Sequence, residues 1–78
     1  MGVKYNGWEN WHTWNTALWL NNEEYSYREG RRICNGRMTQ TQAYRALKCL
    51  AREIIPKNEK INFDMVNWEE IYNNFNEE

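Results

Sequence analysis

Tryptophan is the residue type that most constrains how this chain folds. Four of the five tryptophans lie in one short stretch, at Trp8, Trp11, Trp14 and Trp19. Burial of an aromatic side chain removes about 150–250 Å² from water, and a domain of this size has only a thin core. The rings therefore either build most of that core or anchor a partner in a buried pocket. With 78 residues, the chain is expected to form one helical domain spanning residues 1–78.

Hydrophobic spacing predicts the clearest helix directly after Thr39. Thr39 and Gln42 form a capping box, in which each side chain binds the backbone N–H of the other residue. The apolar side chains that follow share one helical face, at Ala43, Ala46, Leu47, Leu50, Ala51 and Ile54. Pro56 ends this helix. Because small alanines dominate the face, we expect the tryptophan-rich helix to pack against it.

The tryptophan-rich stretch is itself predicted to be a helix, over about residues 10–22. Trp11, Trp14 and Leu18 fall on one of its faces, so we expect the two rings of this face to lie in the core. The helix is also apolar beyond that face. The other two rings of the stretch are expected to be partly exposed, at Trp8 and Trp19.

The residues before this helix are expected to form an extended lead-in with a turn. Asn6-Gly7 is a strong turn dipeptide, and Asn10 is a suitable N-cap for the helix that follows. Val3 and Tyr5 alternate with polar neighbours, which leaves a short strand before the turn as an open alternative.

Two further helices are predicted on either side of the alanine-rich one. The earlier runs from near Glu23 to a favourable stop at Asn35-Gly36. Gly30 lies in its middle, where glycine costs about 1 kcal/mol relative to alanine, so we expect a close crossing with a tryptophan there. The last helix is capped by Asn67, and its apolar face holds Trp68, Ile71, Tyr72 and Phe75.

Together these patterns predict an all-α fold, a small single-domain bundle of three to four short helices. Residues 57–66 are expected to be a loop. Ile61, Phe63 and Met65 alternate with polar residues, so one short extended segment near residues 61–66 stays open as an alternative.

The sequence contains no recognisable catalytic or metal-binding constellation. His12 is the only histidine, and a zinc site needs about four ligands, so we expect His12 to be structural or solvent-facing. Cys34 and Cys49 are expected to be free, half-buried thiols. We therefore predict a protein that is not an enzyme and that uses no cofactor and no metal. No apolar run approaches the about 20 residues of a membrane span, and no signal peptide pattern opens the chain, so a cytoplasmic location is expected.

The distribution of charge suggests where a partner would bind. The net charge is −1, yet nine of the ten basic residues lie within residues 28–60, between acidic ends. The first candidate for a partner-binding face is the basic set Arg31, Arg32, Arg45, Lys48 and Arg52. The second candidate is the acidic set Glu69, Glu70, Glu77 and Glu78. The alternative is internal: the last helix docks beside the basic helices and neutralises them.

The opening of the chain resembles a known group of small proteins. The residues that carry the likeness are Tyr5-Asn6-Gly7-Trp8, Asn10, Thr13-Trp14-Asn15 and Leu18-Trp19-Leu20-Asn21-Asn22, followed near the end by Val66-Asn67-Trp68-Glu69-Glu70-Ile71. This pattern, YNGWxNxxTWNxxLWLNN, is similar to the opening of a family of small uncharacterised proteins from phages and plasmids. The resemblance covers roughly residues 5–27 and 65–75.

The resemblance implies a genomic setting rather than a chemistry. Small proteins of mobile elements often counter host defences, so we expect a non-enzymatic inhibitor of the anti-CRISPR or anti-restriction type that binds a host defence protein. The alternative is a small nucleic-acid-binding module, in which Arg45, Lys48 and Arg52 contact phosphates and exposed tryptophans stack on bases. The slightly acidic net charge weighs against this second class.

Overall fold

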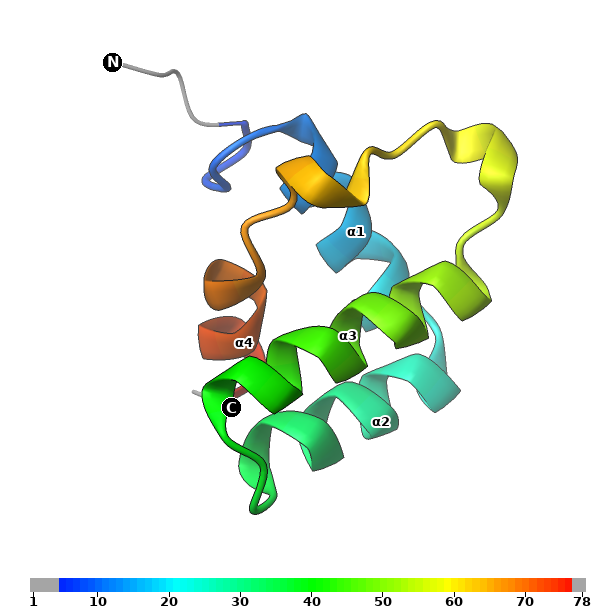
Figure 1. Cartoon of the computed structure of the whole chain (residues 1–78). Helices are drawn as coiled ribbons and strands as arrows, with labels where there is room; N and C mark the ends of the chain where they lie inside the picture. The colour runs from blue at the N-terminus through cyan, green and yellow to red at the C-terminus, as the bar shows by residue number, and fades with distance from the viewer. Residues whose placement is uncertain (1–4, 77–78) are drawn as a thin grey trace.

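The computed structural model describes residues 5–76, which form a bundle of four α-helices and no β-strand. The helices are α1 (Trp11–Asn22), α2 (Glu24–Asn35), α3 (Gln40–Ile54) and α4 (Trp68–Asn76), and two 3-10 turns, η1 (Lys57–Glu59) and η2 (Phe63–Met65), connect α3 to α4. The predicted all-α fold is confirmed (Figure 1).

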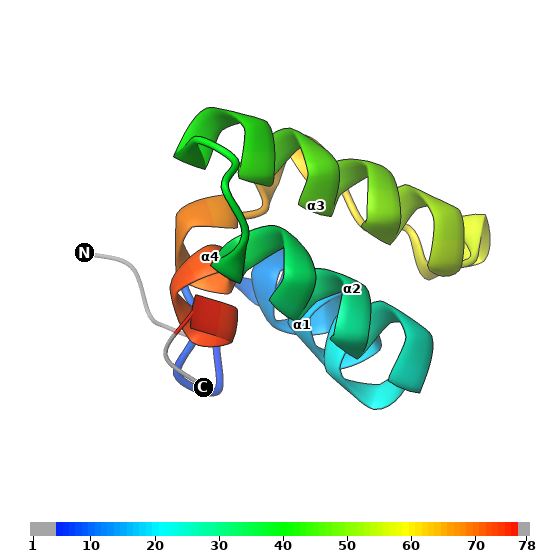
Figure 2. The same cartoon turned by 90° about the horizontal axis from the view of Figure 1, so that it is seen from below.

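All four helices contact one another, and α2 is central to the packing because the three most extensive helix contacts all involve it. Helices α2 and α3 run side by side in both views (Figures 1 and 2). All four helices and two loop positions supply the core, which consists of Ala17, Leu20, Ile33, Cys34, Ala43, Leu47, Leu50, Ala51, Ile55, Val66, Ile71 and Phe75. The apolar faces predicted for α3 and α4 are therefore the faces that the structure buries.

The core face of α1 differs from the prediction. Its buried residues are Thr13, Asn15, Thr16, Ala17 and Leu20. Trp11 and Trp14 are only half-buried, and Leu18 is 41% exposed, so the face predicted to enter the core lies at the surface. Trp8 and Trp19 are half-buried, as expected, and they are the rings of this stretch that pack against the core. Helix α1 does contact α3, as predicted, but without Trp11 or Trp14 in the core.

The size of the side chains on α1 explains this difference. Thr13, Thr16 and Ala17 follow helical spacing and are at most 2% exposed. Small side chains let α1 approach its neighbours closely, whereas an indole ring at these positions would hold the helices apart. Hydrophobic spacing favoured the large rings because three of the five residues on the buried face of α1 are polar.

Gly30 marks the expected close crossing, but its partner is a phenylalanine. A Cβ atom at Gly30 would lie 2.7 Å from Cζ of Phe75, which is fully buried. The absence of a side chain therefore lets the Phe75 ring of α4 sit directly on the backbone of α2. The prediction of a tryptophan at this contact was wrong, because the last helix, rather than the first, crosses here.

Three helices begin at the caps that the sequence predicted. Thr13 N–H donates to Asn10 Oδ1 at 2.8 Å, and Glu70 N–H donates to Asn67 Oδ1 at 3.0 Å. Both bonds of the capping box at α3 form: Gln42 N–H donates to Thr39 Oγ1, and Thr39 N–H donates to Gln42 Oε1. Each cap satisfies backbone groups that a helix start leaves unpaired.

The segments that could have been strands are turns instead. Residues 63–65 form η2, in which Asp64 N–H donates to Asn62 Oδ1, so the extended segment near residues 61–66 is absent. Asn6 and Gly7 have φ angles of 49° and 88°, and Tyr5 and Trp8 exchange two backbone hydrogen bonds across them. This tight turn needs two left-handed residues, which asparagine and glycine tolerate. Val3 lies outside the described residues.

Candidate binding surface

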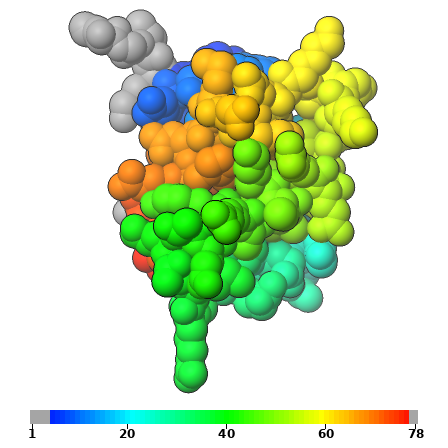
Figure 3. Space-filling view, viewed as in Figure 1, coloured from blue at the N-terminus to red at the C-terminus, as the bar shows by residue number. Residues whose placement is uncertain are grey.

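The outer face of α3 carries three of the five predicted basic residues. Arg45 and Arg52 are exposed and Lys48 is half-buried, on the side of the helix opposite its buried alanines. Residues 57–66 leave the end of α3 and fold back beside this face (Figures 1 and 3). The sequence therefore places a row of cations where a helix and a loop meet.

Long-range contacts hold the loop beside α3. Asn62 N–H donates to Nδ1 of His12 at 3.1 Å, so the only histidine has a structural role, as predicted. Asn15 Nδ2 donates to Glu59 Oε1 at 3.3 Å. Lys48 Nζ lies 3.2 Å from Asp64 Oδ1 and forms an ion pair between α3 and the loop.

An aromatic pair fixes the far end of the loop. The rings of Phe63 and Trp68 stack with centroids 6.3 Å apart and an interplanar angle of 20°. Trp68 Nε1–H also donates to the carbonyl oxygen of Phe63 at 3.2 Å. Because both contacts join η2 to the start of α4, Phe63 keeps a defined position beside α3.

Three adjoining hollows line the contact between α3 and this loop, and Phe63 borders all of them. Their volumes are ≈ 420, ≈ 420 and ≈ 250 Å³. We call this surface the α3 groove and define it by its cationic and apolar lining residues: Arg45, Lys48, Arg52, Lys57, Lys60, Ile55, Ile61 and Phe63. Asp64 is the carboxylate in its wall.

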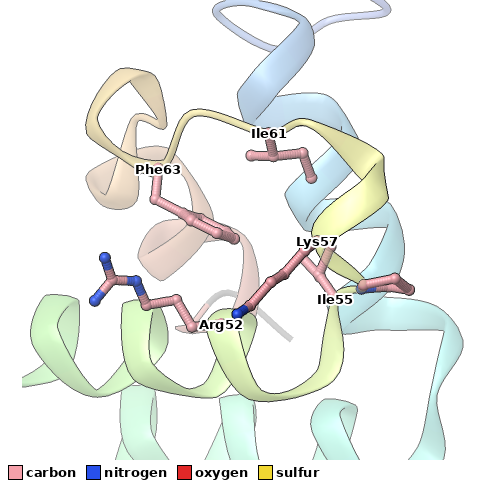
Figure 4. Close-up of a pocket in the computed structure, with 6 residues that line it drawn as sticks. Arg52, Ile55, Lys57, Ile61 and Phe63 are labelled. Atoms are coloured by element: carbon pink, nitrogen blue, oxygen red, sulfur yellow. The ribbon is translucent and has the colours of Figure 1, made fainter.

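One hollow of the α3 groove combines apolar and cationic walls. In Figure 4, Arg52 and Lys57 extend along one side, whereas Ile61 and Phe63 project from the opposite segment. Ile55 lies at its inner end and is 6% exposed. A volume of ≈ 420 Å³ lies within the range of about 300–1,000 Å³ that is typical of ligand pockets. The hollow can accept an apolar side chain next to an anionic group.

The other two predicted basic residues lie on α2 and do not border the α3 groove. Arg32 is exposed and donates from Nε and Nη2 to Glu29 Oε1, at 3.1 and 2.7 Å. This hydrogen bond lowers the pKa of Glu29 and raises the pKa of Arg32. Arg31 is half-buried. The structure thus brings Arg45, Lys48 and Arg52 together with the loop, and leaves Arg31 and Arg32 on the neighbouring helix.

The acidic candidate set is only partly within the described residues, because Glu77 and Glu78 lie outside them. Glu69 is exposed, and Glu70 Oε1 accepts the backbone N–H of Glu9 at 2.9 Å. Desolvation and the nearby Glu69 carboxylate raise the pKa of Tyr44 on α3. The last helix therefore does lie beside a basic helix, as the internal explanation of the charge pattern expected.

Sequence reasoning missed the loop's contribution to the α3 groove. Lys57, Lys60, Ile61 and Phe63 were assigned to a loop or an edge strand and not to a site. A signal was present: two lysines, followed by apolar residues that alternate with polar ones, come directly after a helix whose outer face is basic. This pattern indicates a site only when the loop folds back on α3. That fold-back depends on hydrogen bonds between residues that lie far apart in the sequence.

The thiols show different environments. Cys34 is buried and Cys49 is exposed, and both are free, so the expectation of free thiols is confirmed but that of half-burial is not. Burial raises the pKa of Cys34 to about 11, which keeps the thiol protonated at neutral pH. Among residues 5–76, no cluster of three or more histidine, cysteine or acidic residues could hold a metal ion. None of the helices in this part of the chain has the length and apolar character needed to cross a membrane.

Comparison with known proteins places the chain in a family without assigning an activity. Searches of curated proteins and of solved structures found no match to this sequence. A family model, described as a family of unknown function (DUF7249), matches residues 1–77. Since the match covers nearly the whole chain, the protein belongs to this family of unknown function, DUF7249.

Proposed function

We propose that this protein is a non-enzymatic inhibitor, carried by a mobile element, that binds a host defence protein of a CRISPR or restriction system through the α3 groove. The observation that carries the proposal is the juxtaposition of Arg45, Lys48 and Arg52 with an apolar hollow. The resemblance of the opening motif to phage and plasmid proteins supports the setting. The partner's matching surface is an acidic segment with at least one apolar side chain.

The chemistry of the α3 groove favours a protein segment as its ligand. Arginine binds carboxylates through two parallel hydrogen bonds, and Arg45 and Arg52 are exposed and able to do so. Ile55, Ile61 and Phe63 offer an apolar floor on which a hydrophobic anchor residue of the partner gains binding energy. Such anchors surrounded by charged contacts are typical of protein interfaces.

Nucleic acid is the second candidate, and the aromatic packing in the α3 groove disfavours it. Phe63 already stacks on Trp68, which occupies a ring that would otherwise stack on a base. The net charge of −1 is also unlike that of dedicated nucleic-acid binders.

Affinity capture from host lysate tests this proposal. The double variant Arg45→Glu/Arg52→Glu is expected to lose the defence protein that the native chain retains, with or without nuclease treatment. The control is Arg28→Glu/Arg37→Glu, which makes the same change of charge at exposed positions outside the groove. Arg28 pairs with Glu24 at 2.6 Å, but both side chains are exposed, so loss of this pair costs little stability. Lys48 is left in place because it pairs with Asp64. Retention by both variants, or a complex that nuclease dissolves, would contradict the proposal.

A further inference from the structure

A second surface, around Trp8, has the opposite chemistry to the α3 groove. It is built from residues 5–22 and 66–76, and these two segments contain no lysine and no arginine. Helix α1, at Trp11–Asn22, contains no aspartate or glutamate either, although 27% of the chain is charged. Interface centres are typically rich in aromatic residues and poor in charge. This surface has that composition.

On one side of Trp8 lies a small apolar hollow of ≈ 150 Å³, bordered by Trp14, Leu18 and Asn21. Leu18 is 41% exposed although it belongs to an apolar helix. The ring of Trp14 is supported from the other side by Tyr5, with centroids 4.9 Å apart. The rings are therefore held in place at the surface, so little conformational entropy is lost when an apolar side chain enters.

On the other side of Trp8 lies a polar hollow of ≈ 280 Å³, bordered by Glu70, Asn73 and Asn74. The Glu70 carboxylate is fixed by the backbone N–H of Glu9, at 2.9 Å. The Glu9 side chain is itself exposed, and its Oε1 accepts a hydrogen bond from Asn67 at 3.0 Å. Two carboxylates thus lie close to Trp8, and the segments that build the surface contribute no lysine or arginine to neutralise them.

We infer that the Trp8 surface is a second binding site, which takes a protein segment that presents an apolar side chain next to a lysine or arginine. The apolar side chain enters the hollow between Trp8, Trp14 and Leu18. The cation lies in the neighbouring hollow, where it pairs with Glu70 and contacts the face of the Trp8 ring system. Charge complementarity selects this occupant, because the acidic surroundings disfavour an anionic segment or a nucleic acid. The inference is independent of the function proposed for the α3 groove.

Two synthetic amphipathic peptides test the site directly. One is built from leucine and lysine, and its matched partner carries glutamate in place of lysine. Titration of the 15N-labelled protein is expected to shift the Trp8 and Trp14 indole N–H signals with the leucine–lysine peptide alone. Any binding of the glutamate peptide is expected at the basic α3 groove and not at the Trp8 surface. Equal shifts of the Trp8 and Trp14 signals with both peptides, shifts of these signals with neither, or leucine–lysine shifts confined to the α3 groove would overturn the inference.

Variants with matched controls distinguish peptide binding at the Trp8 surface from general charge attraction to the protein. Leu18→Arg is expected to weaken binding of the leucine–lysine peptide about tenfold, since it places a cation in the apolar hollow. The control Tyr25→Arg, at a position 56% exposed on α2, is expected to change the affinity little. Glu70→Gln, which keeps the acceptor for Glu9 N–H, should weaken binding several-fold, unlike Glu53→Gln. Equal effects of site and control variants would overturn the inference. Self-association through this surface, seen by light scattering and abolished by Leu18→Arg, would assign it to a second copy instead.

Discussion

At the scale of single residues, Gly30 determines how closely α4 approaches α2. The Phe75 ring occupies the space that a Cβ atom at Gly30 would need, at 2.7 Å. Glycine in a helix interior costs about 1 kcal/mol, so its presence here reflects packing rather than helix propensity. The contact ties the last helix to the centre of the bundle.

Replacement of Gly30 by alanine is therefore expected to destabilise the protein. The clash should cost about 1–3 kcal/mol against the roughly 1 kcal/mol gained in helix propensity, which leaves a net loss of up to about 2 kcal/mol. Urea denaturation followed by circular dichroism measures the difference. Adding Phe75→Leu should give a non-additive result, with Gly30→Ala costing less in that background. An alanine variant that is more stable than the native chain would show that the ring moves freely aside.

Cys34 provides a pH-dependent test of burial. Its pKa of about 11 in the folded protein exceeds the ordinary value of 9.0, so the unfolded chain releases its thiol proton first as pH rises. The free energy of unfolding should therefore fall between about pH 9 and 11, by on the order of 1–2 kcal/mol. Cys34→Ala should flatten this part of the pH profile, although it lowers stability at neutral pH. An identical slope in both proteins would contradict the burial of the thiol.

Thiol labelling gives a simpler measurement of the same difference. A thiol reagent at neutral pH is expected to modify Cys49 rapidly and Cys34 only after denaturation, because the first is exposed and the second buried. Mass spectrometry of the native protein should show one modification. Two rapid modifications without denaturant would indicate that α2 opens readily.

At the scale of elements, a comparison of α3 with α1 shows which features could be predicted from the sequence and which could not. The start, end and buried face of α3 followed from spacing, since its two faces differ sharply in polarity. In α1 the buried face carries small polar residues such as Thr13 and Thr16, and apolar residues lie on the outer face, so hydrophobic spacing pointed to the wrong face. The choice between Trp14 and Thr13 depended on how closely the neighbouring helices pack. That distance is a property of the assembled bundle. The α3 groove was also beyond local pattern, because the bond that folds the loop back joins His12 to Asn62.

Because Trp14 lies outside the core, its replacement is expected to lower stability less than the replacement of a core residue. Trp14→Ala should leave the protein folded and cooperative, because the ring is half-buried against Tyr5 and is absent from the core cluster. Phe75→Ala should cost about 3–5 kcal/mol, enough to unfold much of so small a domain. Thermal melts of the two variants test this contrast. Unfolding of Trp14→Ala at room temperature, or equal losses in both, would contradict the assigned face of α1.

At the scale of the whole molecule, two chemically distinct surfaces lie on different elements. The α3 groove is basic with an apolar floor, and the Trp8 surface is aromatic with an acidic border. Figure 2 places α3 along one side of the molecule and α1 with α2 along the other. The small net charge therefore arises from separated regions of opposite sign, which suits recognition of partners by charge.

Binding to nucleic acid is expected to be weak for the whole molecule. At physiological salt, a labelled single-stranded or double-stranded oligonucleotide should bind no tighter than about 10⁻⁶ M, the upper limit of non-specific association. Fluorescence anisotropy over a series of salt concentrations measures both affinity and slope. A sub-micromolar complex whose slope falls in Arg45→Glu/Arg52→Glu would favour the nucleic-acid module.

The most direct test of the account is the survival of an invading phage or plasmid in a host with an active CRISPR or restriction system. Expression of the native chain is expected to raise survival, and Arg28→Glu/Arg37→Glu should retain that effect. Arg45→Glu/Arg52→Glu should abolish it while its melting curve stays unchanged, because exposed charges contribute little to folding. Unchanged survival with the native chain across such hosts, or full protection by Arg45→Glu/Arg52→Glu, would contradict the proposed role of the α3 groove.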